Sequence, residues 1–146
     1  FIMARTKLDL PEKFHFSTKI PVRISDINYG GHMGNDALLS LIHEARIRFL
    51  QNYGYTESNI EGVGTIMVDA VILYKAEAFY GDILRTEVAI DDFTNYSFDV
   101  YYRLRKVESD KEVARAKTTI FFFDYQQRKA ARTPEKFKAI FLDSRS

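Results

Sequence analysis

The sequence predicts an α+β fold in which one long helix packs against an antiparallel sheet. Two observations support this prediction: a single helical stretch at residues 36–53, and a run of four strand-like segments at residues 65–76, 82–92, 96–107 and 112–125. Strands that follow one another without intervening helices favour antiparallel pairing, and segregated helices and strands are typical of the α+β class. A further strand precedes the helix, so we expect five strands.

The first expected strand covers residues 17–25. Ile20, Val22 and Ile24 alternate there with polar neighbours, and this period of two is typical of a strand with one buried face. The same alternation is clearest between residues 98 and 104, where the even positions are apolar. Glycine, asparagine or aspartate separates the later strands at the positions where turns are expected.

The long helix has apolar side chains at positions 38, 41, 42, 45 and 49, which fall on one face. Leu39, Ile47 and Leu50 fall on the other side, so we expect the sheet to wrap the helix. Gly54 is suited to end it, because glycine readily adopts the left-handed conformation that follows many helices. Near the C-terminus, Thr133 as N-cap and Pro134 as the first helical residue predict a short second helix.

Length and composition predict one domain and exclude several classes of function. The chain has 146 residues, 46% of them hydrophobic, which is enough for a single core. Met3 resembles a natural start, so we expect the domain to span residues 3–146. A net charge of +1 gives no basic field for nucleic acid. The absence of cysteine excludes disulfides, thiolate metal sites and a cysteine nucleophile.

Two further classes are excluded by pattern. The chain has no apolar run near the ~20 residues that cross a membrane, and its N-terminus lacks the charged-then-apolar order of a signal peptide. We therefore expect a cytoplasmic protein without a membrane partner. The three histidines are scattered, and no spacing of histidine and acidic residues matches a metal site. We expect neither a metal nor another cofactor.

The most informative segment is residues 26–36, which brings acids, amides, a histidine and three glycines directly before the long helix. Glycines allow backbone N–H groups to approach a ligand, and the first helical turn leaves such groups without intrahelical partners. An oxyanion hole requires donors of this kind. The structural alternative is an ordinary turn with Asn35 or Asp36 as N-cap.

The residues around this loop resemble a known family. The similarity lies in Ser25-Asp26, in His32 preceded by glycine, in Asn35, in the helical Glu44-Ala45-Arg46, and in the turn at Gly81-Asp82. This pattern resembles hot-dog-fold acyl-CoA thioesterases of the hydroxybenzoyl-CoA thioesterase type, and it covers nearly the whole chain. The resemblance implies a long central helix wrapped by an antiparallel five-stranded sheet, and hydrolysis of acyl thioesters.

The chain departs from that family at its usual catalytic carboxylate. The second aspartate of the family's Ser-Asp-x-Asp pattern falls on Asn28, and an amide cannot act as nucleophile or general base. The first asparagine of the family's Asn-Asn pair is replaced by Gly34, while the second remains as Asn35. Either another acid has taken over catalysis, or the chain binds acyl groups without cleaving them quickly.

Our first hypothesis is hydrolysis of an acyl-CoA or acyl-carrier thioester, in which backbone N–H groups hold the carbonyl oxygen while a carboxylate activates water or attacks directly. The resemblance implies that the N–H of Asn35 is the main oxyanion donor. We choose Asp36 as the base, because the helix dipole favours an ionised acid in the first turn. Asn28 and His32 are expected to position water or the thioester.

Three other carboxylates are held in reserve as the catalytic acid. Asp26 belongs to the loop, Glu44 lies in a helix expected to be largely buried, and Asp69 interrupts an apolar run. For Glu44 the structural alternative is an ion pair with Arg48 one turn later. Asp69 lies on a strand that in this family often pairs across a dimer, so its alternative role is a hydrogen bond at that interface.

Basic residues and a strand edge suggest partners. Arg103 and Arg105, together with Arg115 and Lys117, line polar faces of long strands and could meet the phosphates of coenzyme A, or form a solvated sheet face. One helix on one sheet leaves an exposed strand edge, expected at residues 65–76, that a two-fold partner would cover. We expect a homodimer or a dimer of dimers acting on acyl-CoA.

Two alternative functions stay open. Asp26-x-Asn28 followed by His32 is similar to the Asp-x-Asn-Pro-x-His signature of R-specific enoyl-CoA hydratases, although the proline is absent and the histidine lies one residue too far along. A non-catalytic acyl-thioester-binding dimer is motivated by Asn28 itself. Release of free thiol from acyl-CoA would distinguish a hydrolase from a binding protein.

Overall fold

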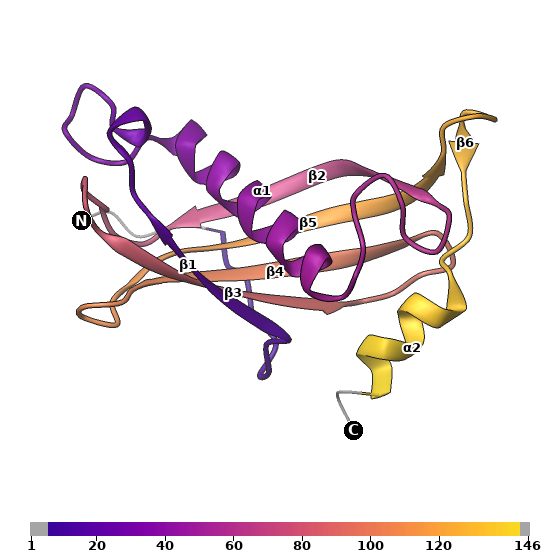
Figure 1. The fold of residues 1–146 in the computed structure, drawn as a ribbon. Helices are drawn as coiled ribbons and strands as arrows, with labels where there is room; N and C mark the ends of the chain where they lie inside the picture. Colours follow the sequence, from indigo (N-terminus) through magenta and orange to yellow (C-terminus); the bar gives the residue numbers. More distant parts are fainter. Residues whose placement is uncertain (1–5, 144–146) are drawn as a thin grey trace.

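The computed structural model describes residues 6–143, in which a long helix lies across one face of an antiparallel sheet (Figure 1). The expected domain limits at residues 3 and 146 lie outside the described residues. The elements in chain order are β1 (Phe16–Pro21), the 3₁₀ turn η1 (Ile24–Asp26), α1 (Asn35–Asn52), β2 (Gly64–Tyr74), β3 (Ile83–Asp91), β4 (Ser97–Lys106), β5 (Glu112–Asp124), β6 (Lys129–Ala130) and α2 (Glu135–Asp143).

The strand order is β1-β3-β4-β5-β2, and the two-residue β6 pairs with β5. All pairs are antiparallel. The five long strands and the α+β class are therefore confirmed, and the arrangement of one long helix on this sheet is the hot-dog fold that the sequence resemblance implied. β6 was not expected. β2 forms one edge of the sheet, where the sequence placed an exposed edge.

Alternation along the strands separates a helix-facing side from an outer side. On β4, Tyr102 and Leu104 are fully buried beneath α1, while the intervening Arg103 and Arg105 are half-buried on the outer side. Cross-strand partners share a face, so Ala116 of β5, which pairs with Tyr102, also faces α1. The period of two read from the sequence thus corresponds to real burial.

Aromatic side chains fill the core at the C-terminal end of α1. Phe137 and Phe141 of α2 are 0% and 1% exposed, and their ring centroids lie 5.0 Å apart. Phe141 packs on Phe49 of α1 at 5.6 Å, and Phe137 packs on Phe98 of β4 at 5.3 Å. Helix α2 therefore closes this end of the space between α1 and the sheet (Figure 1).

The end of α1 agrees with the sequence. Gly54 has a φ of +81°, and its N–H donates to the carbonyl of Gln51 at 3.0 Å while the N–H of Tyr55 donates to Leu50 at 2.8 Å. This pair of bonds satisfies the last carbonyls of the helix. The expected burial on all sides is wrong in part, because Leu39 is 39% exposed although Leu50 is buried.

Two expected element limits are also wrong. The first strand ends at Pro21 and not at residue 25, and Ile24, expected on its buried face, is 71% exposed in η1. A carboxylate oxygen of Asp26 accepts the N–H of Arg23 at 2.8 Å, which turns the chain away from the sheet. Thr133 does not cap α2, because its hydroxyl donates to the carbonyl of Thr94 at 2.8 Å. The carbonyl of Pro134 accepts the first helical hydrogen bond, which the N–H of Lys138 donates.

Within residues 6–143, neither helix combines the length and the apolar character needed to cross a membrane.

Candidate active site at the start of helix α1

The loop that leads into α1 is a closed, hydrogen-bonded structure. Asn28 N–H donates to the carbonyl of His32 at 3.0 Å, and the N–H of Gly31 donates back to Asn28 at 3.1 Å. Gly31 has a φ of +79°, a conformation that glycine adopts without strain. The loop is tied to the rest of the fold by Met33 N–H, which donates to Ala78 beyond β2 at 2.7 Å. Its side chains are therefore presented from a fixed backbone.

Gly34 forms the N-cap of α1. Its N–H donates to the carbonyl of Asp26 at 2.9 Å, and its own carbonyl accepts the first helical bond from Leu38 at 3.3 Å. Asn35 and Asp36 lie inside the helix, so the alternative that either one caps it is wrong. Because the helix begins at Asn35, its first N–H groups have no intrahelical acceptor and point out of the helix start.

The carboxylate of Asp36 lies back over the loop. A Cβ atom on Gly34 would stand 2.8 Å from Oδ1 of Asp36 and 3.6 Å from Cβ of Asn28. A side chain at position 34 would therefore displace Asp36. Glycine at the place of the family's first asparagine leaves room for an acid from the first turn to approach Asn28.

The side chain of Asn28 has a structural role in the loop. Its Oδ1 accepts the N–H of Gly30 at 2.9 Å, which is a local turn that asparagine and aspartate both form. The side chain is exposed. The amide Nδ2 lies on the side of Gly34, 3.8 Å from the place of a Cβ there, so Asn28 has a free donor group facing the helix start.

The depression in front of these groups is open and shallow. It has a volume of about 450 Å³ and is lined by Ser25, Asp26, Ile27, Asn28, Tyr29, Asp36 and Ala37. Asn28 and Asp36 therefore share one concave surface. Tyr29 is fully exposed at its rim.

His32 contributes from the other side of the loop. Its Nδ1 lies 3.2 Å from the carbonyl of Met33, and a carbonyl only accepts, so Nδ1 carries the proton in this contact. Nε2, the other ring nitrogen, faces Glu77, whose Oε1 is 4.0 Å away. The imidazole also packs against Gly30, where a Cβ would lie 3.1 Å from Nε2.

Tyr74, the last residue of β2, is part of this cluster. Its hydroxyl donates to the carbonyl of Asn35 at 3.3 Å. Burial raises the pKa of the Tyr74 hydroxyl, and the negative charge of Asp36 raises it further. Tyr74 and Glu77 were missed from the sequence, because a tyrosine that ends a strand and an acid in the following turn have no local signal of function.

The structure does not bring the reserve carboxylates to this depression as free acids. Asp26 lines it but is 7% exposed, and its two oxygens are engaged by Arg23. Glu44 lies on the helix that was expected to be largely buried, but its side chain is exposed. It forms an ion pair with Arg48 at 2.8 Å, which is the structural role that the sequence offered as the alternative to catalysis. α1 is thus covered on one face only.

Asp69 lies away from the site for a specific reason. Met67 of β2 pairs with the helix-facing Ile120, but the register shifts between Met67 and Asp69, so Asp69 pairs with Thr119. This bulge places Asp69 on the outer side of the sheet, where its charge acts on Asp99. Asp69 is exposed, and five strand residues, or about 16 Å, separate it from Tyr74.

The strand arginines lie on the outer side of the sheet in ion pairs. Arg103 and Arg105 both bind Glu87 at 2.9 Å, and Arg105 also binds Asp110 at 3.1 Å. Arg115 binds Glu112 at 2.7 Å and donates to the carbonyl of Leu8 at 2.9 Å. These contacts favour a solvated sheet face held by ion pairs over a site for the phosphates of coenzyme A. Lys117 shares this side, because its partner Tyr101 alternates with the buried Tyr102.

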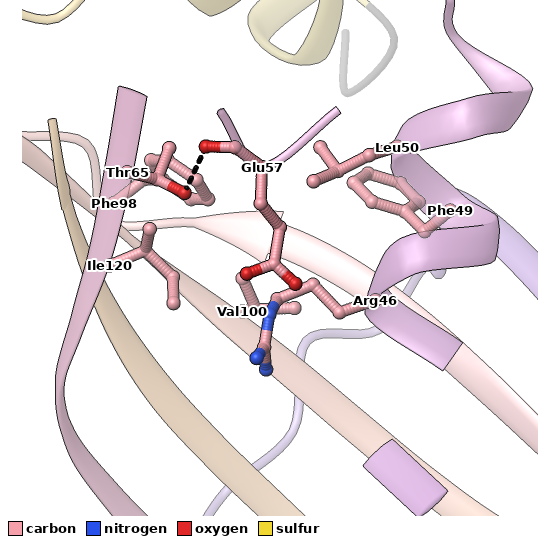
Figure 2. A pocket seen from close by; sticks show the side chains of 8 residues that line it. All are labelled: Arg46, Phe49, Leu50, Glu57, Thr65, Phe98, Val100 and Ile120. Atoms are coloured by element: carbon pink, nitrogen blue, oxygen red, sulfur yellow. Dashed lines mark hydrogen bonds between the residues drawn. The ribbon is translucent and has the colours of Figure 1, made fainter. Parts of the chain in front are cut away.

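A small cavity of about 10 Å³ lies between α1 and the sheet and is lined by Arg46, Phe49, Leu50, Glu57, Thr65, Phe98, Val100 and Ile120 (Figure 2). Such a volume holds about one water molecule, so an acyl group has no room there. Figure 2 shows Arg46 reaching into this space from α1 and Glu57 entering from the following loop.

Arg46 is a buried cation with few partners. It is 7% exposed, and its Nη1 donates to the hydroxyl of Tyr102 at 3.0 Å. That hydroxyl is also bonded to Oγ1 of Thr118 at 2.9 Å, and burial raises its pKa, so it stays protonated. Nε of Arg46 has no hydrogen-bond partner among the described residues. Glu57 instead contacts His43, at 2.6 Å.

Comparison with known proteins agrees with this fold. A family model described as "Thioesterase-like superfamily" matches residues 22–141. A 1,4-dihydroxy-2-naphthoyl-CoA thioesterase from Synechocystis is similar over 88% of this chain and 96% of its own, with 25% identity and a TM-score of 0.79. A gentisyl-coenzyme A thioesterase is similar over 84% of this chain and 99% of its own, with 17% identity and a TM-score of 0.74.

A DHNA-CoA thioesterase from Staphylococcus aureus is similar over 80% of this chain and 78% of its own, with 16% identity and a TM-score of 0.72. A search of curated protein sequences finds no match. The family model spans most of the chain, from the residue after β1 to the second phenylalanine of α2, and it includes every residue of the candidate site. The chain therefore belongs to the thioesterase-like superfamily.

Proposed function

We propose that this protein is an acyl-CoA thioesterase that releases a carboxylic acid and free coenzyme A. The main support is that the unpartnered N–H groups at the start of α1 and the carboxylate of Asp36 lie beside the same open depression. Membership of the thioesterase-like superfamily supports thioester hydrolysis as the reaction class. The names of two similar structures, a dihydroxynaphthoyl-CoA and a gentisyl-CoA thioesterase, support coenzyme A as the thiol.

In the proposed reaction the thioester carbonyl lies at the helix start, where the N–H of Asn35 stabilises the developing oxyanion. Asp36 takes a proton from water as its oxygen attacks the carbonyl carbon. The carbon–sulfur bond then breaks, and the proton held by Asp36 passes to the leaving thiolate. The products are an acid and a thiol, so one water molecule balances the reaction.

Asn28 and His32 have positioning roles in this scheme. The amide Nδ2 of Asn28 faces the helix start, while its Oδ1 is already bonded to Gly30. It can therefore donate to water or to the thioester but not accept a proton. His32 lies across the loop, with Nδ1 at the carbonyl of Met33 and Nε2 toward Glu77.

We also propose that the active form is a homodimer, or a dimer of dimers. β2 is an edge strand, and Ile66, Met67 and Val68 on it are 40%, 40% and 52% exposed. An unpaired apolar edge of this kind is a site of association unless it is covered. A second copy pairing along β2 would cover it with matching residues.

The first experiment measures thiol release from a panel of acyl-CoA substrates by the wild-type protein and by the Asp36→Asn variant. We expect wild-type turnover, and a loss of kcat of about 10²-fold or more in the variant, as is typical when a general base is removed. Glu44→Gln and Asp69→Asn are matched controls, because each neutralises an exposed acid outside the depression; both should keep wild-type kcat.

Asn28→Asp restores the family's acid and should keep or raise turnover, because aspartate forms the same turn with Gly30. If Asp36→Asn is harmless while a control variant loses activity, the assignment of the base is wrong. If no substrate releases thiol with any variant, a non-catalytic acyl-binding protein becomes the better account. One observation favours that second function: the acid of the family is an amide here, with its oxygen bonded to the backbone.

A further inference from the structure

Tyr74 reaches the candidate site from a different part of the chain than the loop does. It ends β2, 39 residues after Asn35, and pairs with Ala114 of β5, which is fully buried. Cross-strand partners share a face, so the phenol ring lies on the side of the sheet that carries α1. From there its hydroxyl donates to the carbonyl of Asn35 at 3.3 Å.

This contact fixes a peptide plane in the first turn of α1. The carbonyl of Asn35 and the N–H of Asp36 belong to one planar peptide group and point in opposite directions. The N–H of Asp36 is one of the helix-start donors without an intrahelical acceptor. A hydrogen bond to the carbonyl therefore restricts the direction of this N–H, and it also polarises the peptide and strengthens the donor.

The same hydroxyl lies within the field of the Asp36 carboxylate. Burial raises the pKa of Tyr74, and the charge of Asp36 raises it further, so the phenol remains protonated and able to donate throughout the neutral range. Gly34 and Asn28 lie on the loop side of Asp36. Tyr74 thus contacts the start of α1 from β2, beside the residues that line the depression.

We propose that Tyr74 is a positioning residue for thioester hydrolysis, which holds the first turn of α1 so that its N–H groups and Asp36 face the substrate carbonyl. This inference rests on the proposed function. It assigns Tyr74 an effect on the transition state and not on substrate binding, because the oxyanion forms only after attack begins.

The test compares Tyr74→Phe with Tyr125→Phe, using the acyl-CoA that the wild-type protein cleaves fastest. Tyr125 is a matched control, since its hydroxyl donates to the carbonyl of Thr65 at 2.8 Å near the opposite end of β2, away from α1's start. We expect Tyr74→Phe to lower kcat by about 10-fold, less than the ~10²-fold loss of a direct oxyanion donor, with KM changed less than about two-fold. Tyr125→Phe should change neither.

Backbone NMR without substrate gives an independent measurement. The carbonyl ¹³C resonance of Asn35 should move in Tyr74→Phe, in the direction of a lost hydrogen bond, and stay in place in Tyr125→Phe. Wild-type kcat in Tyr74→Phe, or an unmoved Asn35 carbonyl, overturns this inference while leaving the proposed function intact. A raised KM with unchanged kcat also overturns it, because Tyr74 would then contact the substrate. A wild-type protein that releases no thiol overturns the proposed function and this inference together.

Discussion

Replacing Tyr102 by phenylalanine tests how the buried cation Arg46 is tolerated. The variant keeps the ring, which is fully buried, and removes only the hydroxyl that binds Nη1 of Arg46 at 3.0 Å and Oγ1 of Thr118 at 2.9 Å. Two buried polar groups then lose a partner. Nε of Arg46 already has no hydrogen-bond partner among the described residues, so the variant would add Nη1 to the guanidinium nitrogens that lack one.

The expected cost follows from these two losses. A buried group left without its hydrogen bond costs about 1–3 kcal/mol, and more when it is charged. We expect Tyr102→Phe to lower the free energy of unfolding by about 3 kcal/mol, which corresponds to a fall in Tm of about 6–12 °C for a protein of this size. Thermal and urea unfolding at one fixed protein concentration measure both quantities, because association would make Tm depend on concentration.

Two further variants make this prediction specific. Tyr101→Phe removes a hydroxyl from the preceding residue, on the outer side of the sheet, where it binds Asp92. The loss should cost less than about 1 kcal/mol, because the exposed carboxylate of Asp92 regains water. Adding Arg46→Met to Tyr102→Phe removes the stranded cation and should recover part of the loss. A Tyr102→Phe protein within about 0.5 kcal/mol of wild type would refute the reasoning.

Three other predictions concern pH, assembly and cofactors. Burial raises the pKa of Tyr55 to about 12, and a hydrogen bond to Glu61 and the charge of Glu61 add to this shift. The folded state therefore holds the phenol proton to higher pH than the unfolded state does. The stability that this proton contributes is complete below the usual tyrosine pKa near 10 and is lost as the pH rises toward 12. Alkaline absorbance titration should show one fewer late-ionising tyrosine in Tyr55→Phe than in the wild-type protein, because the pKa values of Tyr74 and Tyr102 are raised as well. Val68→Lys, which places a charge on the exposed edge of β2, should convert a dimer into a monomer in light scattering, whereas a monomeric wild-type protein would contradict the proposed assembly. The proposed reaction uses backbone donors and a carboxylate, so turnover should survive EDTA; a loss that one divalent ion restores would reveal a metal requirement.

Much of the fold was predictable because burial imposes a period on the sequence. The helical stripe and the strand alternation are direct records of which face meets the core. The errors arose where a local hydrogen bond overrode that period. Asp26 turns the chain at Arg23 before the strand can continue, and Thr133 bonds to Thr94 where a cap was expected.

The candidate site was predictable only where it is contiguous in the chain. Asn28, His32 and Asp36 lie within one loop and the helix start that follows, so sequence distance limits their spatial distance. Tyr74 joins them through strand pairing, which no local pattern records. Asp69 could not be placed, because one extra residue in β2 reverses the face on which it lies.

The position of α2 after every strand of the sheet has a consequence for biosynthesis. Its phenylalanines leave the ribosome later than all five long strands, yet they close the aromatic end of the core against Phe49 and Phe98. Until then, the nascent chain exposes that end together with the edge of β2, and incompletely folded chains with such surfaces aggregate readily. A stop codon shortly before residue 137 would leave every strand of the sheet intact in sequence and still yield a protein dependent on chaperones.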